Sequence, residues 1–103
     1  MIKIAVYVPE DALETVKSAM FEAGAGRTER YEQCAWQTLG QGQFKPLPHS
    51  NPTLGEINQL TYVREYKLEM ICEEAVLRDV VAAMKRAHPY EEPAYGAWPL
   101  IDI

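Results

Sequence analysis

Residues 88–95 read HPYEEPAY, and this short stretch decides how the chain turns into its last strand. It contains two prolines, two tyrosines, a histidine and two adjacent glutamates. A proline fixes its own φ and disfavours the α region for the residue before it. We therefore expect a helix to end at His88 and extended structure to begin near Glu92, so that the stretch forms a rigid turn.

The N-terminal part of the chain predicts a strand followed by a helix. Residues 2–8 alternate strongly apolar side chains with other residues, which is typical of a strand with one apolar face. Asp11 and Glu14 have the spacing of a capping pair at a helix start, and Gly24 is suited to the helix end. The apolar stripe of this helix would be Leu13, Val16, Met20 and Ala23.

The remaining residues predict three more strands and a second helix. We expect strands over residues 30–38, 60–72 and 95–101, with the last at an edge or a bulge because it contains Gly96 and Pro99. Residues 39–59 are rich in glycine and proline and predict a long loop, of the kind that is usually functional or mobile. The apolar stripe of the second helix would be Val76, Leu77, Val80, Val81, Met84 and Ala87.

This order of elements predicts an α+β fold of the ferredoxin-like, split βαβ type, with one domain over residues 1–103. The order is strand, helix, strand, strand, helix, strand, which gives a four-stranded antiparallel sheet with two helices on one face. The other face would have no helices, and we expect the exposed aromatic residues to lie on it: Trp36, Tyr62, Tyr95 and Trp98. Such a face is typical of an interface, so we predict a homo-oligomer.

Composition and charge narrow the classes of partner. Apolar residues make up 48% of the chain and charged residues 24%, as in a soluble globular domain. The net charge of -5, without a basic patch, argues against nucleic acid and against an anionic membrane. The N-terminus resembles neither a signal peptide nor a membrane span, so we expect a cytoplasmic protein. Cys34 and Cys72 would then be reduced, buried apolar residues in strands.

Four segments resemble one known family. They are residues 3–9 (KIAVYVP), residues 21–26 (FEAGAG) before Tyr31, residues 40–46 (GQGQFKP) and the 88–95 turn. Together they resemble the domain inserted in bacterial NIF-three-like (YqfO-type) proteins. The last segment also resembles the corresponding turn of CutA, the divalent-cation-tolerance protein, which shares the ferredoxin-like, PII-like fold. The resemblance implies a trimer-forming module whose long loop is a ligand or partner element, as in PII-type signal proteins.

The resemblance does not carry a catalytic centre to this sequence. Full-length NIF-three-like proteins hold a di-metal site of histidines and carboxylates in the halves that flank the insert, and they are also described as GTP cyclohydrolase type-two homologues. This sequence has only His49 and His88, so it cannot rebuild that centre. Its long loop also lacks the basic cluster of a PII protein. No serine or cysteine is tied to either histidine, so we assign no catalytic residue.

The turn contains the only candidate metal ligands. His88, Glu91 and Glu92 supply an imidazole and two carboxylates, and a three-fold assembly would multiply them into a site for a divalent cation. The alternative is that His88 caps the second helix while the two glutamates are solvated. Spacing within one chain does not decide between these readings.

The candidate ligand-binding residues lie in the long loop and in the turn. Gly40 and Gly42 would let a backbone approach an anionic ligand closely, with Phe44 and Lys45 beside it. Tyr90 and Tyr95 would line a ligand cleft between subunits. The alternatives are that the loop packs on a neighbouring subunit, that the tyrosines pack in the core or an interface, and that His49 is an exposed polar residue.

The sequence therefore predicts a non-enzymatic, oligomeric, CutA-like or PII-like module that binds a small ligand, a divalent metal ion or a protein partner. One alternative is an accessory subunit of, or a remnant related to, a NIF-three-like metal-dependent hydrolase. Another is a purely structural assembly unit.

Overall fold

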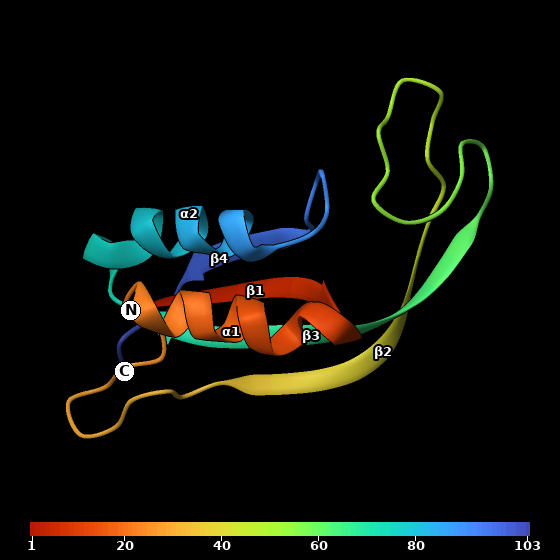
Figure 1. The fold of residues 1–103 in the computed structure, drawn as a ribbon. Coiled ribbons are helices and arrows are strands. Elements are labelled where there is room, and N and C mark those ends of the chain that lie inside the picture. Colours follow the sequence, from red (N-terminus) through yellow and green to blue (C-terminus); the bar gives the residue numbers. More distant parts are fainter.

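The order of elements along the chain is the predicted one. The computed structural model describes residues 1–103, with short 3₁₀ turns before both helices (Figure 1). The strands and helices are β1 (Ile2–Pro9), α1 (Leu13–Glu22), β2 (Trp36–Phe44), β3 (Thr61–Cys72), α2 (Leu77–Ala87) and β4 (Tyr95–Pro99). No helix is long and apolar enough to cross a membrane.

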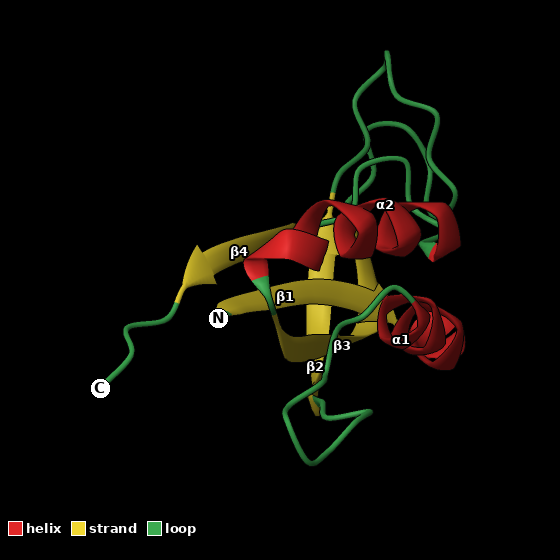
Figure 2. Ribbon diagram, turned by 90° about the vertical axis from the view of Figure 1, so that its left-hand side faces the viewer, coloured by secondary structure: helices red, strands yellow, loops and turns green.

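The four strands form one antiparallel sheet in the order β2-β3-β1-β4. The two helices lie side by side against one face of it (Figure 2). This is the ferredoxin-like α+β fold that the sequence predicts, with β4 at an edge. The β2–β3 hairpin extends beyond the helices, and the loop that joins its strands lies at the far end (Figure 1). The molecule is therefore elongated, with extents of 46 × 25 × 24 Å.

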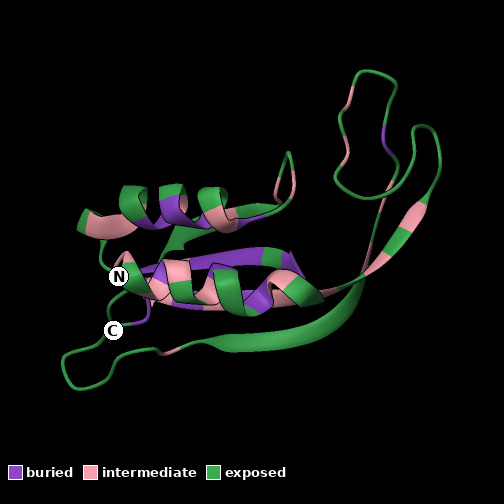
Figure 3. Cartoon of the chain, in the orientation of Figure 1, coloured by how far each residue is buried: buried purple, intermediate pink, exposed green.

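The core lies between the sheet and the helices. β1 alternates as predicted, with Ile4, Val6 and Val8 fully buried. Leu68, Met70 and Cys72 of β3 lie opposite this strand, and α1 and α2 cover the same face (Figure 3). The core residues are Ile2, Ile4, Val6, Val8, Leu13, Val16, Met20, Ala25, Leu68, Met70, Cys72, Val80 and Met84.

The start of α1 differs from the predicted capping pair. Residues Glu10–Ala12 form a 3₁₀ turn, and no side chain caps either this turn or the helix after it. Glu14 pairs instead with Lys17, at 2.9 Å between carboxylate and ammonium. The predicted stop is confirmed, because Gly24 follows the helix with φ at +114°, a conformation that suits glycine.

The second strand lies later in the chain than predicted. β2 spans Trp36–Phe44, so the strand prediction for residues 30–35 is wrong, and so is the loop prediction for residues 39–44. The glycines and glutamines of β2 show no apolar alternation, since the strand is exposed along nearly its whole length (Figure 3). Pairing with residues 61–69 of β3 makes it a strand. Cys34 consequently lies before the strand and is only half-buried.

Only two of the four predicted aromatic residues lie on the face without helices. Trp36 and Trp98 are on that face, because they pair with Glu69 and Lys3, which alternate with the buried residues. Tyr95 pairs with Val6 and therefore shares the helix face, where Lys85 of α2 lies over its ring at 5.2 Å. Tyr62 also falls on the helix face, in the part of the hairpin that extends past the helices. Register in the sheet decides these placements.

Candidate functional site

The turn after α2 is attached to β1 through His88. α2 ends at Ala87 and His88 is extended and buried, as the prolines predict. The backbone N–H of Tyr90 donates to His88 Nδ1 at 3.1 Å, so the proton of the neutral ring lies on Nε2. Nε2 in turn donates to the carbonyl of Tyr7 at 2.8 Å. The ring thus holds Tyr90 in place beside β1.

The long loop, residues 45–60, is fastened to the same turn. The backbone N–H of Asn51 donates to both carboxylate oxygens of Glu91, at 3.2 Å each. The Thr53 hydroxyl donates to the carbonyl of Pro89 at 2.7 Å. These bonds join segments about 40 residues apart, and they close the loop over the end of the sheet.

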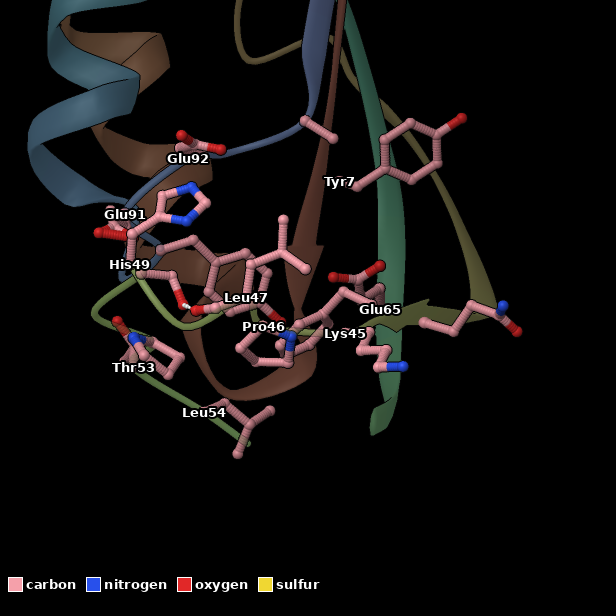
Figure 4. Close-up of a pocket in the computed structure, with 16 residues that line it drawn as sticks. Tyr7, Lys45, Pro46, Leu47, His49, Thr53, Leu54, Glu65, Glu91 and Glu92 are labelled. Carbon is pink, nitrogen blue, oxygen red and sulfur yellow. Dashed lines mark hydrogen bonds between the residues drawn. The ribbon is translucent and has the colours of Figure 1, made fainter. Parts of the chain in front are cut away.

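A pocket of about 420 Å³ lies between the loop, the turn and the sheet (Figure 4). The loop supplies one wall, residues 90–94 supply another, and the ends of β1, β2 and β3 supply the floor. The lining residues are Tyr7, Gln43, Phe44, Lys45, Pro46, Leu47, His49, Ser50, Pro52, Thr53, Leu54, Glu65, Tyr90, Glu91, Glu92 and Ala94.

The Tyr90 hydroxyl is the least satisfied polar group of this pocket. Its oxygen is buried and has no hydrogen-bond partner. Burial, the negative charge of Glu65 and the approach of that carboxylate to the hydroxyl raise the pKa of Tyr90 to about 12. The hydroxyl lies beside the Glu65 carboxylate without a well-formed hydrogen bond to it, so a ligand placed between the two groups can bond to both.

A glycine gives the Glu65 carboxylate its position. Glu65 lies opposite Gly40 in the β2–β3 register, and Gly42 is two residues along on the same face of the sheet. A Cβ at Gly42 would collide with the Glu65 carboxylate. At Gly40, by contrast, a side chain would meet only open space. Gly42 thus leaves room for the carboxylate, whereas Gly40 has no comparable role.

The structure brings together three of the six predicted ligand-binding residues. Phe44, Lys45 and Tyr90 line the pocket, and the rings of Phe44 and Tyr90 are 6.2 Å apart between centroids. Gly40 and Gly42 are in β2 and do not line it. Tyr95 lies in β4, also outside the pocket.

The predicted metal ligands are close in sequence but do not form a ligand set within one chain. No group of three or more histidine, cysteine, aspartate or glutamate side chains is placed to hold a metal ion. Both ring nitrogens of His88 are already hydrogen-bonded, and Glu91 is bonded to Asn51. Glu92 also lines the pocket. A divalent-metal site stays a prediction that depends on ligands from further copies of the chain.

Sequence reasoning missed several residues of the pocket. The alternation around Glu65 predicts only that its side chain lies on a solvent-exposed face of a strand. Tyr7 lies in an apolar strand, where nothing marks it as a pocket residue. Thr53 and Leu47 lie in a loop with no periodic pattern. His49 is exposed, as expected, and it also lines the pocket. The glycine and proline content predicted a long loop of the kind that is usually functional or mobile, but nothing local indicated which segment it would contact.

The chain is similar to part of several longer known proteins. A Bacillus subtilis protein called GTP cyclohydrolase 1 type 2 homolog is 43% identical to this chain over 98 residues. A Listeria monocytogenes protein of the same name is 46% identical over 99 residues. A Bacillus cereus protein related to NIF3 superposes with a TM-score of 0.82 at 38% identity, covering 98% of this chain. The chain is similar to one part of these NIF3-related proteins, and its fold is that of CutA1. CutA1 from Pyrococcus horikoshii superposes on the chain with a TM-score of 0.71, over 100% of this chain and 86% of CutA1. Because the two sequences are only 15% identical, this similarity supports the fold alone.

The match to the longer relatives is partial. The chain spans about a quarter of their length, with 26% covered in each of the two curated relatives and in the Bacillus cereus structure. No family model matches the chain.

The bond between Asn51 and Glu91 is testable by hydrogen exchange. In Glu91→Ala the Asn51 amide loses its charged acceptor, so we expect it to exchange about three to ten times faster, with Thr53 and its neighbours following. Glu92→Ala removes the adjacent carboxylate, which makes no hydrogen bond, and should leave the rate unchanged. Equal rates in both variants would show that Glu91 does not hold the loop.

The raised pKa of Tyr90 predicts a late titration. Because the folded chain holds this proton more tightly than the unfolded chain does, its contribution to stability is complete below about pH 10 and is lost as the pH rises towards 12. Tyrosine ¹³Cζ NMR, with the signal assigned by Tyr90→Phe, should give a midpoint near pH 12. Glu65→Gln should lower this midpoint, because it removes the negative charge beside the hydroxyl. A midpoint near 10 in the unsubstituted chain would contradict the described environment.

Proposed function

We propose that this NIF3-like domain is a non-enzymatic, oligomeric module that binds a small ligand in the pocket between the long loop and the 88–95 turn. The buried, unpartnered hydroxyl of Tyr90 on the pocket wall carries the proposal. A buried polar group without a partner costs free energy, and a ligand that bonds to it removes that cost. The pocket volume also falls within the usual range of small-molecule sites.

Exposed strand and aromatic surface supports the oligomeric part of the proposal. β2 is an edge strand of nine residues with almost no burial, and long exposed edges pair readily with other chains. Trp36 and Trp98 are 67% and 43% exposed on the face without helices. Contact with further copies would cover both features. A trimer is the assembly that the resemblance to NIF-three-like and CutA proteins implies.

A second candidate function follows from the relatives. Proteins named GTP cyclohydrolase 1 type 2 homolog match 95% of this chain, so it is proposed alternatively as an accessory domain or subunit of a NIF3-like hydrolase. Affinity capture from the source cells tests this proposal. Recovery of a protein with the flanking NIF3-like sequence would support it, and a chain that captures no such protein would argue against it.

Assembly is expected at micromolar concentration. Light scattering after size-exclusion chromatography should give a mass of about three times 11.7 kDa. Trp36→Glu and Trp98→Glu introduce charge on the face without helices and should shift the protein towards the monomer. The control is Tyr31→Glu, at an aromatic residue outside the sheet that is more exposed than either tryptophan. A monomeric unsubstituted chain would overturn the oligomeric part of the proposal.

Ligand binding in the pocket is testable with a fragment library followed by ¹⁵N NMR. We expect fragments that shift the amide signals of residues 45–54 and 90–94 together. Ala94→Trp places a large ring at the pocket wall and should abolish these shifts. Ala82→Trp makes the same change at an exposed position of α2 and should preserve them. If no fragment acts on these signals in the unsubstituted chain, the ligand-binding proposal fails.

A further inference from the structure

We infer that the pocket selects a small organic cation, whose ammonium group lies between the Glu65 carboxylate and the rings of Phe44 and Tyr90. This inference rests on the proposed function, because it names the class of ligand that the pocket takes. It replaces the anionic ligand that the glycines of residues 40–46 suggested.

The charge of the lining favours a cation. Glu65, Glu91 and Glu92 contribute three carboxylates, whereas Lys45 is the only lysine or arginine in the lining. None of the three carboxylates takes part in a salt bridge. An anion would therefore enter a region of negative potential, while a cation would neutralise it.

Glu65 is the carboxylate best placed to bind the cation. Its two cationic neighbours in β3 are engaged elsewhere, since Arg64 pairs with Glu10 at 2.9 Å and Lys67 reaches Glu69 at 3.9 Å. Glu91 is already occupied by the backbone of Asn51. Glu65 makes no ion pair, although the Tyr90 hydroxyl lies beside it. A carboxylate without a cationic partner in a partly closed pocket forms a strong, charge-assisted hydrogen bond with an ammonium group.

The aromatic walls fit the same ligand. The rings of Phe44 and Tyr90 are tilted by 52° to each other, with their centroids 6.2 Å apart. A cation over an aromatic ring is attracted by the negative face of the ring, and the attraction grows as water is excluded. The Tyr90 hydroxyl adds a polar group for a substituent of the ligand. Charge, rings and hydroxyl are thus presented together on adjoining walls.

An organic cation fits this set better than a bare metal ion. A divalent metal needs several ligands around it, and the chain provides no group of three or more histidine or acidic side chains suited to one. An ammonium group needs only one carboxylate and an apolar surround. A pocket of about 420 Å³ has room for an organic body attached to that group.

The test compares probes that differ in charge. We would titrate ¹⁵N-labelled protein with n-butylammonium, tetramethylammonium, n-butanol and butyrate at constant ionic strength, and follow the signals of residues 42–54 and 90–94. Both cations should shift these signals, while the alcohol and the acid should not. A blocked tripeptide with a central lysine is titrated alongside these probes. Binding of the peptide would show that the ammonium group can belong to a protein partner, whereas binding of the small cations alone would indicate a free small molecule.

Substitutions assign the effect to the named groups. Glu65→Gln keeps the shape of the side chain and should weaken cation binding about tenfold or more. Phe44→Leu should weaken tetramethylammonium about two- to fivefold. Glu73→Gln, at an exposed carboxylate just after β3 that makes no salt bridge and does not line the pocket, should have no effect. Gly42→Ala should displace the Glu65 carboxylate and reproduce the loss without removing its charge.

The outcomes separate the ligand class from the pocket itself. If fragments, the alcohol or butyrate bind in the pocket and neither cation does, the inference is overturned while the proposed function stands. Cation binding that Glu65→Gln leaves unchanged also overturns it. If neither fragments nor probes act on the pocket signals, both proposals fall.

Discussion

The structure depends on the burial of one face of β1. Ile4, Val6 and Val8 are fully enclosed, which requires a strand on each side of β1 and a layer of helices above it. β3 and β4 supply the sides and α1 and α2 supply the layer. A fully buried aliphatic side chain contributes about 1.5–3 kcal/mol, so this contact dominates what a small domain can gain from folding. The rest of the chain is arranged around it.

β2 and the long loop depend least on this core. The hairpin continues past the helices, where its side chains have no layer to pack against, and β2 is held by its ladder with β3. The loop is instead held through polar contacts of Asn51 and Thr53 with the turn. These few hydrogen bonds contribute less to stability than a packed apolar core does, and they do not fill the space between the loop and the turn. The pocket is therefore found where the core ends.

The 88–95 turn joins these two parts. Its histidine bonds to the carbonyl of Tyr7 in β1, and its Glu91 bonds to the loop. Between them, Tyr90 is held on the pocket wall with an unpartnered hydroxyl. The same turn that sets the direction of β4 thus shapes the candidate site, and residues selected for their effect on the backbone also determine the chemistry of the pocket.

The sequence by itself determined the fold, because its signals are local. The alternation of residues 2–8, the helical stripes and the prolines of the turn act through neighbouring residues, and they predicted the element order, the end of α2 at His88 and the edge position of the last strand. They also indicated Phe44, Lys45 and Tyr90, each within two residues of a proline or glycine. Local patterns failed for residues 39–44, where pairing with β3 overrides weak strand propensity.

Only the tertiary structure decided which residues share the site. Register in the sheet placed Tyr95 on the helix face and brought Glu65 beside Gly42, and closure of the loop brought Asn51 to Glu91. A shift of one residue in register would have moved these side chains to the opposite face of the sheet. No local pattern in β2 fixes that register. The pocket and its charge therefore arise from contacts between distant segments, whose energies depend on how the whole chain packs.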